Sequence, residues 1–191
     1  LNRFTEESWQ DIDDSFIKGE IGSRVAYSRI AALIKGSRQE MTDFVLRHGV
    51  IDPGFRDFYN YCRGRGIEIR IVSDGLDFYI SAIMAHHGLS EIRYYSNTAT
   101  FGNNGGIRIG FPHAREICGK CGTCKRFVLE TYRASHKRII YVGNGLSDVC
   151  PSGEADLVFA KDILWERCRE NGTDCVRYNN FHDVQKHLMQ I

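Results

Sequence analysis

The sequence lacks any long apolar run. No stretch approaches the roughly 20 residues that a membrane-spanning helix requires, and no charged start followed by an apolar stretch resembles a signal peptide. We therefore expect no membrane partner and a cytoplasmic location. An excess of one charge is also absent, because 25 Lys and Arg residues face 24 Asp and Glu residues. Without a long-range electrostatic field we expect no nucleic-acid partner, so any anion must be bound by a local site.

Length and composition are those of an ordinary globular chain. With 191 residues, 42% of them hydrophobic, the chain is long enough for one domain, or for a core with a small attached lobe. The seven Cys residues do not indicate a disulfide framework in a chain this large, so we expect reduced thiols. We expect a monomer or a homodimer.

Helical and strand-like patterns alternate along the chain. Up to about residue 46, apolar residues recur at helical spacing, which predicts several short helices. Farther on we expect strands at 67–73, 92–97, 138–142, 157–160 and 175–178, helices at 55–66, 76–87, 125–135, 163–169 and 181–189, and a hairpin at 103–106. This order is typical of an α/β fold with an open parallel sheet and helices on both faces.

Polar residues follow the strand predicted at 67–73. In an open α/β sheet, ligands bind at the carboxyl ends of the strands. There, the hydroxyl of Ser73 and the N–H groups of a tight turn through Asp74 and Gly75 could donate to phosphate oxygens. A serine-capped helix start would give the same three residues.

Lys125 opens the helix predicted at 125–135. Its ammonium could neutralise a phosphate, and the N-terminus of the helix would add N–H donors. A lysine at such a place can equally be a solvated surface residue.

The segment Gly143–Asp148 follows the compact apolar run at 138–142. Its two glycines would let the backbone approach a ligand closely. Asn144 and Asp148 carry oxygen atoms, which Mg²⁺ prefers as ligands. The segment therefore predicts a magnesium site, although a β-turn followed by an Asp helix cap would use the same residues.

A cluster of cysteines lies immediately before Lys125. Cys118, Cys121 and Cys124 have the spacing Cys-x-x-Cys-x-x-Cys, and with His113 they could supply four ligands for Zn²⁺. The alternative is that these are reduced, partly buried thiols in a loop that positions Lys125.

The order and spacing of Ser73, Lys125 and the segment Gly143–Asp148 resemble the motifs of the haloacid-dehalogenase (HAD) superfamily of phosphohydrolases. The resemblance extends to the phosphoserine-phosphatase-like branch, through residues 73–78, 112–125 and 155–161. It implies a HAD-like α/β fold, with a Rossmann-like core at 63–191 and a small helical cap at 1–62. It also implies that Ser73 and Lys125 are catalytic, and that Asn144 stands where the family usually has an aspartate.

The first motif of that superfamily is Asp-x-Asp at the end of a strand, and one segment of the chain matches it in residue types alone. Asp11 and Asp13 fit it, but no apolar strand precedes them and the pattern around them is helical. We expect that this match is a decoy, and that the strand with its nucleophilic aspartate lies upstream of Leu1. On this interpretation the chain has no nucleophile of its own and is inactive alone.

Together these features predict a Mg²⁺-dependent phosphomonoesterase that acts on a small phosphorylated metabolite through an aspartyl-phosphate intermediate. The resemblance implies a methionine-salvage phosphopentene as one such substrate. The alternative is a non-catalytic relative that binds a phosphorylated ligand or is stabilised by zinc. The neutral Asn144 and the missing Asp-x-Asp favour that alternative.

Overall fold

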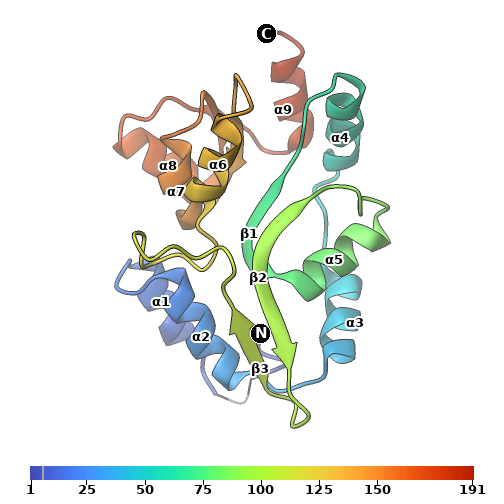
Figure 1. The fold of residues 1–191 in the computed structure, drawn as a ribbon, viewed down its shortest axis with the longest axis vertical. Helices are drawn as coiled ribbons and strands as arrows, with labels where there is room; N and C mark the ends of the chain where they lie inside the picture. Colours follow the sequence, from blue (N-terminus) through green and yellow to red (C-terminus); the bar gives the residue numbers. More distant parts are fainter. Residues whose placement is uncertain (6) are drawn as a thin grey trace. The chain divides into compact units, whose positions relative to one another are not determined.

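Two units divide the chain in the computed structural model, which describes residues 1–5 and 7–191 (Figure 1). One unit consists of Leu1–Gly49 and Ile71–Cys124, and the other consists of Val50–Arg70 and Lys125–Ile191. Each unit has its own sheet and its own hydrophobic cluster. The units differ in their bounds from the expected cap and core, and the division into a cap at 1–62 and a core at 63–191 stays a proposal.

The first unit contains a three-stranded sheet in the order β1-β2-β3. Strands β1 and β2 are parallel, and β3 returns antiparallel to β2 through the predicted hairpin turn. Helix α2 packs against β3 and helix α3 packs against α5 (Figure 1). The elements are α1 Gln10–Ile17, α2 Ser23–Leu33, α3 Arg38–His48, β1 Ile71–Leu76, α5 Asp77–His86, β2 Tyr94–Phe101 and β3 Ile107–Gly110.

Strand β1 begins later than predicted. We expected a strand at 67–73, but β1 begins at Ile71, which lies opposite Tyr94, the first residue of β2. Strand β2 therefore offers no partner to residues 67–70. Isolated β-prone residues do not form a strand without a neighbour that completes their hydrogen bonds.

Strand β1 also contains a bulge. Val72 lies opposite Tyr95 and Leu76 lies opposite Asn97, so four steps along β1 face two steps along β2. The three residues between Val72 and Leu76 are those predicted to form a loop. A bulge leaves backbone groups outside the ladder, so this part of the strand is available for other contacts.

The core of the first unit joins helices from the start of the chain to the hairpin. The buried residues Ile34, Met41, Leu76 and Phe78 form its centre. Phe101 packs edge-on against Phe78, with their ring centroids 5.1 Å apart. Helix α3 is fixed at its start by a capping box, in which the Ser37 hydroxyl accepts from the Glu40 N–H and the Glu40 carboxylate accepts from the Ser37 N–H.

The second unit contains a parallel three-stranded sheet in the order β4-β5-β6. Helix α8 packs against β5, and α4 packs against α9 (Figure 1). The elements are α4 Phe55–Gly64, α6 Lys125–Arg133, β4 Ile140–Gly143, the 3₁₀-helix η1 Leu146–Asp148, α7 Val149–Ser152, β5 Leu157–Ala160, α8 Asp162–Glu170, β6 Val176–Arg177 and α9 Phe181–Leu188.

Two apolar clusters support the second unit. Under helix α8, the buried residues Val158, Ala160, Leu164 and Cys168 pack together. Between α4 and α9, three phenylalanine rings contact one another, with centroids 4.9 to 6.4 Å apart, and these are Phe55, Phe58 and Phe181. The second cluster holds the segment at 50–70 to the C-terminal half of the chain.

The α/β class predicted from the sequence is confirmed, since parallel strands alternate with helices. The described residues pair β1 with β2, β4 with β5 and β5 with β6 in parallel, as predicted. They form two sheets of three strands, with β1 at an edge of one and β4 at an edge of the other. No helix among residues 1–5 and 7–191 is long and apolar enough to cross a membrane.

Candidate functional site

Lys125 and Asp148 form a buried ion pair in the second unit. Lys125 is the first residue of α6, and Asp148 ends the short helix η1 that follows β4. The Lys125 Nζ lies 2.6 Å from Asp148 Oδ1, and the two side chains are only 10% and 8% exposed. The lysine is therefore not a solvated surface residue, which was the alternative interpretation of its place in the sequence.

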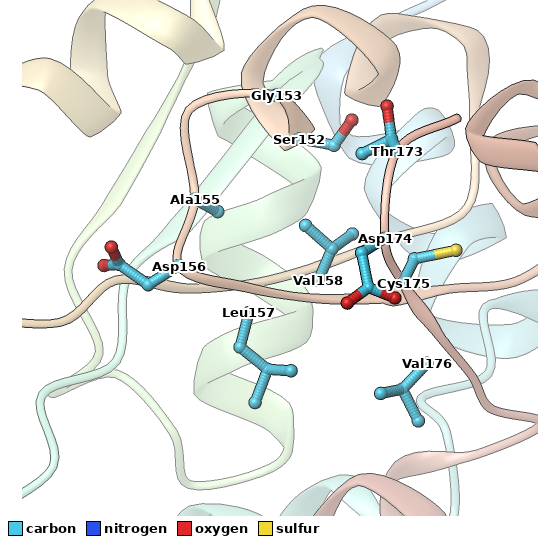
Figure 2. A pocket seen from close by; sticks show the side chains of 10 residues that line it. All are labelled: Ser152, Gly153, Ala155, Asp156, Leu157, Val158, Thr173, Asp174, Cys175 and Val176. Carbon is cyan, nitrogen blue, oxygen red and sulfur yellow. The ribbon is translucent and has the colours of Figure 1, made fainter. Parts of the chain in front are cut away.

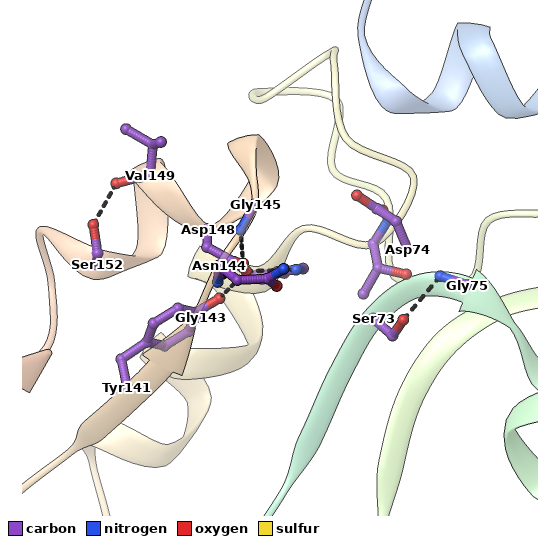
Figure 3. A network of polar contacts seen from close by, with 12 residues as sticks. Ser73, Asp74, Gly75, Tyr141, Gly143, Asn144, Gly145, Asp148, Val149 and Ser152 are labelled. Atoms are coloured by element: carbon purple, nitrogen blue, oxygen red, sulfur yellow. Dashed lines mark hydrogen bonds and ion pairs between the residues drawn. The ribbon is translucent and has the colours of Figure 1, made fainter. Parts of the chain in front are cut away.

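The Asp148 carboxylate accepts hydrogen bonds at both oxygens (Figure 3). Oδ1 accepts from Lys125 and, at 2.7 Å, from the Tyr141 hydroxyl. Oδ2 accepts from the N–H groups of Asn144 at 3.0 Å and Gly145 at 2.9 Å. Burial raises the pKa of this carboxyl, but the Lys125 charge and the hydrogen bonds outweigh burial and hold the pKa below its ordinary value.

Four donors occupy the lone-pair positions that one carboxylate offers. Direct coordination of a metal by Asp148 would require it to release one of them. Tyr141 was not singled out in the sequence, because it lies within an apolar run typical of a buried strand. Its hydroxyl was the only sign that this strand also carries a polar group to the site.

The loop that carries Asn144 is shaped by a close approach at Gly143. A Cβ placed on Gly143 would lie 2.8 Å from Asp148 Cγ, so only glycine fits there without displacing the carboxylate. The Asn144 side-chain nitrogen lies 3.4 Å from Asp162 Oδ2, which leaves the amide oxygen as the group that could meet a cation. Asp162 has a φ of 51°, the one positive value among the non-glycine residues that the structure describes.

Ser73 and Gly75 are linked in the bulge of β1, in the first unit. The Gly75 N–H donates to Ser73 Oγ at 3.0 Å, which leaves the serine hydroxyl hydrogen to donate elsewhere (Figure 3). A Cβ on Gly75 would lie 2.1 Å from the Tyr79 hydroxyl oxygen. A side chain at position 75 would therefore require the Tyr79 ring to move.

Asp74 is the buried member of the same bulge, at 8% exposure. Its Oδ1 accepts from the Thr123 N–H at 2.8 Å, and its backbone oxygen accepts from the Asn97 side chain at 2.7 Å. The Thr123 hydroxyl also donates to Asn97 Oδ1 at 3.1 Å. Asp74 Oδ2 is buried and has no hydrogen-bond partner among the residues that the structure describes.

This network uses the Asp74 carboxylate and backbone oxygen, and not the backbone N–H that was predicted to donate to phosphate. A carboxylate accepts hydrogen bonds and repels a phosphate, so its side chain is not a phosphate donor. The backbone N–H of Asp74 is the part that can still serve. Asn97 and Thr123 were missed in the sequence because their contacts with Asp74 bridge segments 23 and 49 residues apart.

The three cysteines of the cluster lie together in the first unit. The Cys118 sulfur is in hydrogen-bond contact with the Cys121 and Cys124 thiols and with the N–H groups of Lys120 and Cys121. Burial raises the pKa of Cys118, but these hydrogen bonds outweigh burial and lower it below its ordinary value. Burial, followed by contact with Cys118, raises the pKa of Cys121 to about 12.

His113 contacts this loop through its backbone, since its carbonyl oxygen accepts from the Cys124 N–H at 3.0 Å. Its ring packs edge-on against Tyr95, and burial lowers the pKa of the imidazole. Among residues 1–5 and 7–191, no group of three or more His, Cys, Asp or Glu side chains is placed to hold a metal ion. Zinc binding by Cys118, Cys121, Cys124 and His113 stays a prediction.

The structure therefore places the predicted site residues in two groups, one in each unit. Lys125, Asn144 and Asp148 lie together in one unit, and the bulge with Ser73 lies in the other. A common phosphate site for Ser73 and Lys125 stays a prediction. Asp11 lies exposed on helix α1, as the helical pattern predicted, and not at the end of a strand.

The second unit also has a small pocket of about 210 Å³ (Figure 2). Ala155, Leu157, Cys175 and Val176 are among the residues that line it. These residues lie at the starts of β5 and β6, whereas Lys125 and Asp148 gather where β4 ends. The pocket is therefore distinct from the lysine–aspartate site.

The chain belongs to the Putative Phosphatase family, whose pattern matches residues 27–190.

Curated relatives match over the whole chain. This chain is 31% identical to the 2-hydroxy-3-keto-5-methylthiopentenyl-1-phosphate phosphatase of Brevibacillus brevis (strain 47 / JCM 6285 / NBRC 100599), over 100% of this chain and 87% of that protein. The enzyme of the same name from Bacillus velezensis (strain DSM 23117 / BGSC 10A6 / LMG 26770 / FZB42) is 30% identical, over 100% of this chain and 82% of its own length.

Solved structures share the fold at lower identity. A substrate-bound phosphoserine phosphatase complex has a TM-score of 0.70 at 20% identity, covering 95% of this chain and 85% of that chain. A phosphoserine phosphohydrolase-like protein from Francisella tularensis has a TM-score of 0.69 at 16% identity, covering 93% and 82% respectively.

Proposed function

We propose that the protein is a Mg²⁺-dependent phosphomonoesterase that hydrolyses a small phosphorylated metabolite through an aspartyl-phosphate intermediate. The observation that carries the proposal is the buried pair of Lys125 and Asp148, because a lysine held in place by a carboxylate is a fixed positive charge. Such a charge, aimed where negative charge develops, stabilises the transition state of phosphoryl transfer. We place the active protein in the cytoplasm.

Each residue has a separate task in this proposal. The Ser73 hydroxyl and the N–H groups of Asp74 and Gly75 donate to phosphate oxygens. To do so, the Gly75 N–H exchanges its present acceptor, Ser73 Oγ, for a phosphate oxygen. Lys125 neutralises the transferring phosphoryl group, and Asp148 holds Lys125 in position.

The residues present fit magnesium only in part. Asn144 offers an amide oxygen, and Asp162 brings a carboxylate next to it, both of which are oxygen ligands suited to Mg²⁺. Asp148 does not fit as a direct ligand, since its four lone-pair positions already accept hydrogen bonds. We therefore propose Asn144, and not Asp148, as the ligand from this loop. A bound Mg²⁺ would shield the phosphate charge from an anionic nucleophile.

The nucleophile in this proposal is an aspartate from sequence upstream of Leu1. Two observations support it. Asp11 is exposed on a helix and cannot serve at a strand end, and β1 and β4 each lie at the edge of a sheet, where another strand can pair. The helices at 1–62 would then act as a cap that selects the substrate and excludes water.

The substrate is proposed from the relatives. Two of them, about 30% identical, are named for a methionine-salvage phosphopentene, 2-hydroxy-3-keto-5-methylthiopentenyl-1-phosphate. We propose a phosphorylated metabolite of this size and charge. Phosphoserine follows less directly, because the phosphoserine phosphatase structures share the fold at 20% identity or less.

The test is hydrolysis of p-nitrophenyl phosphate by the chain with and without its native upstream sequence. We expect Mg²⁺-dependent turnover with the upstream sequence, and none by the chain that begins at Leu1. Lys125→Ala should remove turnover, whereas Lys137→Ala, on an exposed lysine of the same unit, should not. Turnover by the chain beginning at Leu1 would contradict the upstream nucleophile, and full activity of Lys125→Ala would contradict the role of the lysine.

A non-catalytic phosphate-binding role is the second candidate, favoured by the neutral Asn144. It predicts that inorganic phosphate protects the longer chain against thermal unfolding although no turnover occurs. The p-nitrophenyl phosphate assay separates the two functions, because a phosphatase and a binding protein both bind phosphate but only the phosphatase releases p-nitrophenol.

A further inference from the structure

Asn97 is a fully buried polar residue of β2, at 0% exposure. Its side-chain nitrogen donates to the Asp74 backbone oxygen at 2.7 Å, and its side-chain oxygen accepts from the Thr123 hydroxyl at 3.1 Å. A carbonyl oxygen can only accept hydrogen bonds, so the amide nitrogen must be the atom that faces Asp74. The Thr123 hydroxyl then satisfies the amide oxygen, and the Asn97 side chain is held in one orientation.

The contact with Asn97 fixes the peptide bond between Asp74 and Gly75. In a planar trans peptide, the C=O and the N–H that follows it point in opposite directions. Because the Asp74 carbonyl faces Asn97, the Gly75 N–H faces away from Asn97. It donates instead to Ser73 Oγ at 3.0 Å. This N–H is a donor that the proposed function assigns to a phosphate oxygen, so Asn97 controls where that donor points.

Glycine at position 75 makes this control necessary. Glycine adopts positive and negative φ about equally readily, so the peptide that precedes it can turn over at little steric cost. In the turned-over form, the Asp74 carbonyl oxygen would face the phosphate and repel it. The hydrogen bond from Asn97 favours the observed form, because turning the peptide over would leave the buried amide nitrogen of Asn97 unpaired.

We propose that Asn97 is a positioning residue that aims the Gly75 N–H at the phosphate of the substrate, an inference that rests on the proposed function for the identity of that ligand. Asn97 acts through the peptide between Asp74 and Gly75. It does not itself contact the phosphate, since its side chain is buried and its two polar atoms already have partners.

The isosteric variant Asn97→Asp reverses the contact with the peptide. It places an acceptor oxygen where the amide nitrogen faced the Asp74 carbonyl, so the turned-over peptide is favoured. Inorganic phosphate should bind about 10- to 100-fold more weakly in isothermal titration calorimetry, as expected for the loss of one hydrogen bond to a charged group. The KM for p-nitrophenyl phosphate should rise by a similar factor in the chain with its native upstream sequence.

Asn97→Ser is the second variant, and it keeps the test available if the buried carboxylate of Asn97→Asp prevents folding. It removes the amide donor without placing a new charge beside the Asp74 carbonyl. The affinity for inorganic phosphate should fall in the same direction as in Asn97→Asp, by a smaller factor.

Nuclear magnetic resonance can observe the peptide itself. Asp74 and Gly75 form the one Asp-Gly pair in the 191-residue sequence. Carbonyl carbon-13 labels on aspartate and nitrogen-15 labels on glycine therefore mark a single amide among these residues. Its signal should shift when inorganic phosphate is added to the wild type, and it should not shift in Asn97→Asp. A purely structural role of Asn97 would leave this response unchanged.

Ile34→Val is the control for stability. Ile34 is a buried residue in the core of the same unit, and the variant removes one methylene group there without altering the contacts of Asn97. The midpoint of urea unfolding should fall, while the affinity for inorganic phosphate should stay that of the wild type. An equal loss of phosphate affinity in Ile34→Val and Asn97→Asp would contradict the positioning role.

The outcomes separate the role of Asn97 from the proposed function. Wild-type phosphate affinity in a folded Asn97→Asp or Asn97→Ser variant would overturn the positioning role and leave the phosphatase function standing. A wild type that binds phosphate without turnover would overturn only the hydrolysis, since the phosphate affinities of the variants still decide the role of Asn97. A wild type that shows neither phosphate binding nor turnover would overturn both.

Discussion

The Thr123 amide nitrogen donates to the Asp74 carboxylate across 2.8 Å, although 49 residues separate them in the chain. This bond ties the cysteine loop, which leads directly into Lys125, to the bulge that carries Ser73. Asn97 completes the link by bonding both partners. The loop is thus held to the bulge of β1 by polar contacts.

Removing the Asp74 carboxylate should destabilise the protein. Asp74→Ala would leave the buried Thr123 N–H without its acceptor, and we expect a loss of about 1–3 kcal/mol in the free energy of unfolding. Asp74→Asn keeps an oxygen for the same N–H and should cost less. Urea unfolding followed by circular dichroism measures both. Equal losses in the two variants would show that the hydrogen bond to Thr123 is not what Asp74 contributes.

Tyr141 should stabilise the protein through its hydroxyl group. Tyr141→Phe removes one donor from the buried Asp148 carboxylate, and hydrogen bonds to charged groups contribute roughly 1.5–3 kcal/mol. Tyr61→Phe is the matched control, because the Tyr61 ring packs on Arg65 while its hydroxyl has no hydrogen-bond partner among the described residues. Urea titration of both variants tests this, and indistinguishable midpoints would contradict it.

Acid should weaken the protein through Asp148. Because its pKa is lower in the folded than in the unfolded state, the unfolded state binds more protons at acidic pH. The contribution of Asp148 is therefore complete above the ordinary pKa of about 4, and it is lost as pH falls through the lower folded value. Asp148→Asn should be less stable at neutral pH and should show a flatter decline below pH 4. Thermal unfolding across that range measures this, with Asp11→Asn, an exposed helical residue, as control.

Contact between the start of α2 and the cysteine loop should make Gly22 intolerant of a side chain. A Cβ there would lie 2.2 Å from the Lys120 carbonyl oxygen, which is backbone and cannot move aside cheaply. We expect Gly22→Ala to cost about 1–3 kcal/mol, as overpacking does. Gly64→Ala has no atom within 4 Å of the new Cβ and should be neutral or stabilising by about 0.4–1 kcal/mol. A neutral Gly22→Ala would mean that the loop does not pack as described.

A carboxylate at position 144 should strengthen magnesium binding. Asn144→Asp adds a negative charge to an oxygen ligand, so the Mg²⁺ concentration for half-maximal effect should fall. Isothermal titration calorimetry of Mg²⁺ gives a measurement that does not depend on turnover. Asn171→Asp, on the exposed residue that follows α8, controls for the added charge. An unchanged Mg²⁺ titration would argue that this loop is not the metal site.

The sequence by itself determined the α/β class and the order of most helices and strands, and it singled out Ser73, Lys125 and Asp148 as candidate site residues. Each of these depends on patterns within about ten residues, such as an apolar run that ends at a glycine or a β-branched segment that ends at a serine. The start of β1 could not be predicted in this way, because a strand begins where a neighbour offers hydrogen bonds, and β2 begins opposite Ile71.

Only the tertiary structure decided what the side chains of the site contact. Lys125 could have been solvated, and it became a buried cation because Asp148, 23 residues away, folds against it. Asp148 was predicted as a metal ligand, and only the structure shows that Tyr141 and two N–H groups also donate to its carboxylate. Burial and long-range hydrogen bonds are properties of the folded chain, since they join residues whose distance along the sequence carries no information about their distance in space.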